Sequence, residues 1–137
     1  MIEQSKENIE RVIGRIREIG GDRIAFIALY GSVAKNRDTH LSDIDLAVFY
    51  EGSTEERFKF RMSVLGRTGD EFDVQIFQDL PLYIQKEVIT YGKLLYYGEY
   101  DVVFDIYINT IKNFDDFTRH LNLYYSYSGG VSIERRK

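Results

Sequence analysis

The sequence has no cysteine, no tryptophan, one proline and only two histidines. Without cysteine it can form no disulfide, no thiolate zinc site and no thiol nucleophile. With His40 and His120 as the only imidazoles, a multi-histidine metal site is disfavoured. Any bound metal would therefore be held by oxygen, which favours carboxylates with magnesium, calcium or manganese.

The chain also lacks a long apolar run and an excess of positive charge. Its apolar stretches are far shorter than the roughly 20 residues that span a bilayer, and no charged segment leads into an apolar one at the start. We therefore expect a soluble, cytoplasmic protein without membrane contact. The net charge of -4 disfavours bulk binding of nucleic acid, which depends on Lys and Arg neutralising phosphates.

What is present is enough for one folded domain over residues 1–137. Hydrophobic residues make up 44% of the chain, so a core can form. In chain order the patterns predict a helix stopped by Gly20 and Gly21, a buried strand at 23–30, a strand at 43–49, a helix after Ser53, a strand at 71–77, a helix from Pro81 to Gly92, an edge strand at 94–97 and a long final helix. Strands alternating with helices predict an α/β (α+β) domain, a small sheet flanked by helices.

Two of the expected helices carry an apolar pattern that predicts their packing. Ser53 with Glu56 has the form of a capping box, and the helix that follows places Phe58, Met62 and Leu65 on one face. The final helix belongs to a C-terminal helical part at 81–127. Its apolar stripe comprises Val103, Tyr107, Ile111, Phe114, Phe117, Leu121 and Tyr124.

Acidic side chains gather on two of the expected strands. Asp43 and Asp45 are two residues apart, so they point to the same side of their strand while Ile44 and Leu46 face the core. Asp73 lies on the polar face of a later strand. If these strands are neighbours, three carboxylates converge, and two unit charges about 4 Å apart repel by about 4 kcal/mol at an effective dielectric near 20. A divalent cation relieves that repulsion, and magnesium is the natural occupant.

A Gly-Ser pair ends the first buried strand, and ten residues separate it from the first of these carboxylates. Gly31 has no Cβ, so a phosphate could approach its backbone closely. Ser32 would offer a hydroxyl and an amide N–H to the same anion. With Asp43, Asp45 and Asp73 as metal ligands, these parts indicate two-metal phosphoryl or nucleotidyl transfer. Glu71 shares a strand face with Asp73 and is the alternative third carboxylate.

The stretch GSVAKNRDTHLSDIDLAVF resembles the signature of DNA-polymerase-β-like nucleotidyltransferases, in particular the small prokaryotic MNT domains. The resemblance covers about residues 7 to 77. It implies a polymerase-β-like fold, two magnesium ions and ATP or another nucleoside triphosphate as substrate. Carried over, Asp43 and Asp45 would hold both metals, and Asp73 would complete the catalytic metal site. Gly31 and Ser32 would hold the β- and γ-phosphates.

The chain's length resembles that of MNT antitoxins, whose partners are HEPN-type toxins. That resemblance implies transfer of AMP to a tyrosine of such a toxin, which silences it. Two alternatives from other classes stand beside it. One is a nucleotidyltransferase acting on a small molecule, and the other is a non-catalytic module that blocks its partner by binding. An intact acidic cluster counts against the last, because a steric inhibitor has no need of it.

Overall fold

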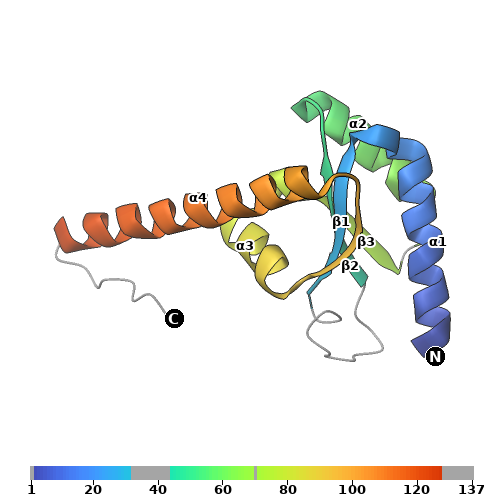
Figure 1. Cartoon of the computed structure of the whole chain (residues 1–137), viewed down its shortest axis with the longest axis horizontal. Helices are drawn as coiled ribbons and strands as arrows, with labels where there is room; N and C mark the ends of the chain where they lie inside the picture. The colour runs from blue at the N-terminus through green and yellow to red at the C-terminus, as the bar shows by residue number, and fades with distance from the viewer. Residues whose placement is uncertain (1, 32–43, 70, 128–137) are drawn as a thin grey trace.

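A four-stranded mixed sheet with two helices on each face organises the chain (Figure 1). The computed structural model describes residues 2–31, 44–69 and 71–127. The elements are α1 (Ile2–Gly20), β1 (Ile24–Tyr30), β2 (Ile44–Tyr50), α2 (Thr54–Leu65), β3 (Phe72–Ile76), α3 (Leu82–Tyr91), β4 (Lys93–Tyr97) and α4 (Tyr100–Tyr127), with 3₁₀ turns at Gly21–Arg23 and Phe77–Asp79. The predicted fold class is confirmed, and each predicted helix and strand is present within a few residues of its expected bounds.

The strand order is β3-β2-β1-β4, which places the third and fourth strands at the two edges. β1 pairs antiparallel with both β2 and β4, whereas β2 and β3 run parallel. A parallel pair cannot be joined by a tight turn, and α2 supplies the crossover between β2 and β3. The edge strand expected at 94–97 is β4.

The two faces of the sheet bury separate hydrophobic cores. One core lies under α1 and α2, where Ile16 and Val64 are fully buried against Leu46 and Val74 of the sheet. The other lies under α3 and α4, where Val88 and Val103 pack near Phe26. In Figure 1 these helix pairs stand on opposite sides of the strands. As predicted, Leu46 faces the core, and Ile44 packs against the same cluster.

The buried face of α2 differs from the stripe that the sequence suggested. Phe58 and Met62 are exposed, and Phe60 and Val64 are buried instead. The helix carries two apolar pairs with the same four-residue spacing, so periodicity alone could not choose between them. The ring of Phe60 stacks on Tyr50 with a centroid separation of 4.1 Å, which turns this face toward the sheet.

The final helix, α4, is confirmed, but much of its predicted apolar stripe is exposed. Val103 is buried over the sheet, whereas Ile111, Phe117 and Tyr124 of the same predicted stripe are exposed. Figure 1 shows α4 extending well past α3 and the strands. Its 28 residues span about 42 Å, against about 15 Å for the ten residues of α3. None of the helices in the described part of the chain is long and apolar enough to cross a membrane.

The capping box at the start of α2 is confirmed and carries an ion pair. The Ser53 hydroxyl accepts from the Glu56 amide at 3.2 Å, and the Ser53 amide donates to Glu56 Oε1 at 2.9 Å. Arg23 Nη1 donates to Glu56 Oε2 at 2.6 Å. Hydrogen bonds from the Ser53 amide and from Arg23 lower the pKa of Glu56 from 4.5 to about 2.

Glu56 is therefore expected to make stability depend on pH in the acid range. Because its folded pKa is depressed, its contribution is full above pH 4.5 and is lost as the pH falls toward 2. Urea denaturation of wild type and Glu56→Gln at pH 6, 4 and 2.5 should show the difference between them shrinking as the pH falls. Because both partners are exposed, salt should weaken the effect. A difference that stays constant over this range would contradict the assignment.

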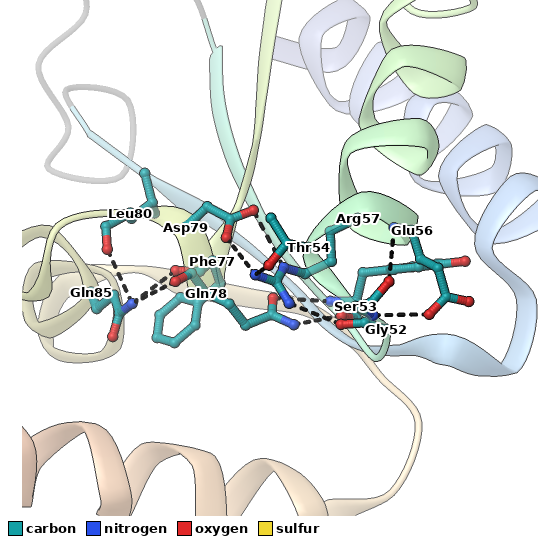
Figure 2. Close-up of polar contacts among 11 residues, drawn as sticks. Gly52, Ser53, Thr54, Glu56, Arg57, Phe77, Gln78, Asp79, Leu80 and Gln85 are labelled. Atoms are coloured by element: carbon teal, nitrogen blue, oxygen red, sulfur yellow. Dashed lines mark hydrogen bonds and ion pairs between the residues drawn. The ribbon is translucent and has the colours of Figure 1, made fainter.

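A group of polar side chains ties the ends of β2 and β3 to α2 and α3 (Figure 2). Arg57 of α2 donates to Asp79 Oδ1 at 2.8 Å and to the Gly52 carbonyl at 2.8 Å. The Gln85 amide of α3 donates to the carbonyls of Phe77 at 3.1 Å and Leu80 at 3.1 Å. These carbonyls belong to the 3₁₀ turn after β3 and its flank, so Gln85 fixes the path of the chain into α3.

Removing the Gln85 donor is expected to destabilise the protein. Gln85→Met keeps the length of the side chain but removes the donor to the Leu80 carbonyl and one of the two donors to the Phe77 carbonyl, at a cost of about 1–2 kcal/mol. Urea denaturation measures the loss. The exposed Lys59→Met in α2 serves as the control and should change stability by less than about 0.5 kcal/mol. An equal effect of the two substitutions would contradict the role given to Gln85.

Candidate functional site

Three polar side chains form a row across the sheet where β1 ends and β2 and β3 begin. Tyr30 pairs with Asp45 across the antiparallel β1–β2 ladder. Asp45 pairs with Asp73 across the parallel β2–β3 ladder. Register partners on adjacent strands lie about 5 Å apart and point to the same face. The two carboxylates therefore stand side by side, on the face that α3 covers further along.

Gly31 follows this row directly and has a backbone that only glycine adopts easily. Its φ is +82°, in the left-handed region. A Cβ at this position would overlap Oδ2 of Asp45 and lie 3.2 Å from Cγ of the same residue. Because Gly31 has no side chain, the backbone of the turn lies directly against the carboxylate of Asp45.

Asp73 has a partner on its own strand. Gln75 lies two residues further on, on the same face, and its Nε2 donates to Asp73 Oδ1 at 2.9 Å. In the strand register Gln75 lies opposite the buried Ala47 of β2, whose side chain is only a methyl group. One oxygen of Asp73 is therefore held by the sheet itself.

Tyr30 is a site residue that the sequence analysis did not identify. Burial first, and then the negative charges of Asp45 and Asp73, raise its pKa to about 12. The hydroxyl therefore stays protonated at physiological pH and can act as a hydrogen-bond donor. The available signal was its position, since it is the last strand residue before Gly31. Its neighbours could be known only from the strand pairing.

Of the remaining predicted site residues, only Glu71 lies in the described part of the chain. Ser32 and Asp43 lie outside the described residues. Glu71, the alternative third carboxylate, is exposed and lies one residue before β3, so it is not paired with Asp45. Among residues 2–31, 44–69 and 71–127, no group of three His, Cys, Asp or Glu side chains is placed to hold a metal ion.

The chemistry of the described donors fits a hard divalent cation. Mg²⁺ prefers carboxylate oxygens and usually takes one or two of them together with phosphate oxygens. Asp45 and Asp73 supply such a pair, and Gly31 brings the backbone of its turn directly against Asp45. No nitrogen or sulfur ligand is needed. The pair, the turn and the neutral Tyr30 hydroxyl together could bind a triphosphate and its metal.

Chains of solved toxin–antitoxin complexes have the same fold. A chain of a toxin–antitoxin crystal structure with AMP-PNP matches with a TM-score of 0.67 and 18% identity, over 88% of this chain and 98% of that one. A chain of the complex between the tri-AMPylated HEPN toxin and the MNT antitoxin of Shewanella oneidensis matches with a TM-score of 0.64 and 16% identity, over 91% and 98%. At these identities the likeness shows a common fold.

Sequence comparison gives a relative and a family. A candidate protein adenylyltransferase of Methanocaldococcus jannaschii is 38% identical over 76 residues, which cover 56% of this chain and 58% of that protein. The match thus spans little more than half of that relative. The profile of the family described as polymerase beta, nucleotidyltransferase matches residues 15–101, from α1 to the start of α4. Because this match takes in more than half of the sequence, the chain belongs to the polymerase beta nucleotidyltransferase family.

Proposed function

We propose that this nucleotidyltransferase transfers AMP from magnesium-bound ATP to a tyrosine hydroxyl of a HEPN-type toxin and so acts as its antitoxin. The observation that carries the proposal is the register pairing of Asp45 with Asp73 directly beside the left-handed turn at Gly31. Two neighbouring carboxylates are the ligands that Mg²⁺ commonly takes together with phosphate oxygens.

Each end of the site has a distinct role in the proposal. Asp45 lies on the interior strand β2, next to Gly31, so we assign the triphosphate to this end of the site. Ser32 would add its hydroxyl and amide to the β- and γ-phosphates, and Asp43 would join Asp45 and Asp73 as metal ligands. The magnesium ions would neutralise charge on the phosphates and make the attacking oxygen a better nucleophile.

Asp73 lies on the edge strand β3, so this side of the site suits the acceptor. In the proposed reaction the acceptor oxygen attacks the α-phosphorus of ATP. A new oxygen–phosphorus bond forms, the bond to the leaving pyrophosphate breaks, and the acceptor proton passes to the carboxylate of Asp73. Tyr30 pairs with Asp45 across the β1–β2 ladder and would line the same end of the site as the triphosphate.

The proposal of a protein acceptor rests on the proteins to which this chain is similar. The matched folds come from toxin–antitoxin complexes, one of them solved with AMP-PNP and another holding a HEPN toxin that carries AMP groups. The relative from Methanocaldococcus jannaschii is named as a candidate protein adenylyltransferase. These likenesses support a protein acceptor over a small molecule.

Transfer of label tests the proposal. The protein is incubated with α-³²P-ATP, Mg²⁺ and the protein encoded by the neighbouring gene, and mass spectrometry locates the modified residue. We expect AMP on a tyrosine of a HEPN-type partner, no transfer with EDTA, and loss of the partner's toxicity. Label on a small molecule instead would favour the small-molecule alternative. Silencing of the toxin without any label would favour a steric antitoxin.

A further inference from the structure

Gln75 makes a contact that neither the family signature nor the proposed metal set includes. Its side-chain nitrogen lies 2.9 Å from Asp73 Oδ1, within the normal range for an N–H···O bond. A hydrogen bond to an ionised acceptor is stronger and more directional than one between neutral groups. The contact therefore restrains the rotation of the Asp73 carboxylate.

The strand geometry explains why this contact forms. Asp73 and Gln75 alternate with the buried residues Phe72, Val74 and Ile76, so both point to the site face of β3. In the strand register Gln75 lies opposite Ala47 of β2, and Ala47 lies opposite Ala28 of β1. Both alanines are fully buried. With only methyl groups directly beside it in this row, the Gln75 side chain reaches along its own strand to Asp73.

We infer that Gln75 is a positioning residue: it holds Oδ1 of Asp73 and so presents Oδ2 toward the metal and the acceptor hydroxyl. The inference rests on the proposed function and deepens it. Without the hydrogen bond from Gln75, a carboxylate on an edge strand can rotate toward solvent. With it, the carboxylate keeps one orientation. Partners that orient a metal ligand typically change metal affinity or activity by 10- to 100-fold when removed.

A positioning role and a purely structural role of Gln75 predict different effects when Gln75 is removed. If Gln75 acts through Asp73, removing Gln75 must matter only while the Asp73 carboxylate is present. If Gln75 merely supports the strand, its loss should matter equally in either background. A double-mutant cycle separates these cases, because it isolates the coupling between two residues.

The cycle uses binding of Mn²⁺ alone, followed by electron paramagnetic resonance, so it needs neither ATP nor a partner protein. The proteins are wild type, Gln75→Met, Asp73→Asn and the double variant. We expect Gln75→Met to weaken Mn²⁺ binding about tenfold in the wild-type background and by less than about twofold beside Asp73→Asn. Gln85→Met, the same substitution in the polar group at the other end of the sheet, should leave Mn²⁺ binding unchanged.

Each outcome decides between the two claims. Equal weakening in both backgrounds, or no weakening in either, overturns the positioning role and leaves the proposed function standing. Weakening by Gln85→Met as large as that by Gln75→Met would also overturn it, since general loss of stability would then explain both. Failure of the wild-type protein to bind Mn²⁺ would overturn the metal site in the proposed function and this inference with it.

Discussion

Replacing Asp73 with asparagine is expected to abolish AMP transfer while ATP binding survives. The nucleotide and its metal would still meet Asp43, Asp45 and the Gly31 turn, whereas the acceptor would lose the carboxylate that orients it and takes its proton. Loss of a group used mainly in the transition state lowers kcat far more than ground-state affinity. We expect kcat to fall roughly a thousandfold, or about 4 kcal/mol of barrier, and ATP affinity to change by less than about threefold.

Single-turnover transfer of labelled AMP and calorimetric titration with a non-hydrolysable ATP analogue measure the two quantities. Glu71→Gln is the matched control, because it removes a negative charge from the same strand end without touching the row across the sheet. It should remain active. If Glu71→Gln is inactive and Asp73→Asn is active, the third carboxylate is Glu71. If both are active, neither carboxylate is essential for transfer, and the catalytic role proposed for Asp73 is wrong.

Gly31→Ala is expected to disable the site with only a modest loss of stability. An alanine at a φ of +82° costs about 1–2 kcal/mol in backbone strain. Its methyl group would also displace the carboxylate of Asp45, because a Cβ there overlaps Oδ2. Affinity for the magnesium complex of the ATP analogue should therefore fall by at least about tenfold, since a misplaced carboxylate no longer meets the metal.

Gly21→Ala separates strain from displacement. Gly21 also has a left-handed backbone, with φ of +55°, but no atom lies within 4 Å of a Cβ added there. This variant should lose a similar amount of stability in urea denaturation and bind the nucleotide normally. A Gly31→Ala protein that is folded by circular dichroism and binds the nucleotide as wild type would contradict the role of this turn.

Local patterns were sufficient to predict the elements of this fold. The alternation in β3, the capping box at Ser53 and the stop at Gly20 each depend on a few adjacent residues. The choice of helix face was different, because α2 offers two equivalent apolar pairs and only packing on Tyr50 selects Phe60. The sequence also could not show that the apolar stripe of α4 continues beyond the sheet that it packs on.

The candidate site was predicted as residues but not as an arrangement. Asp45 and Asp73 were expected to converge if their strands were neighbours, and the strands are neighbours with these two residues in register. The sequence contained no information on that register, so it could neither choose between Glu71 and Asp73 nor detect Tyr30. The roles of Ser32 and Asp43 remain predictions, because both residues lie outside the described part of the chain.

The parallel pairing of β2 with β3 also has a consequence for how the chain reaches its active form. Asp45 and Asp73 are 28 positions apart and meet only after the α2 crossover has closed. The entropy of that closure is lost before the contacts form, so such non-local pairings assemble late in folding. Before this pairing forms, the two carboxylates of the proposed site are not held together. Any ligand that binds there selects fully folded molecules and adds to their stability as its concentration rises above its Kd.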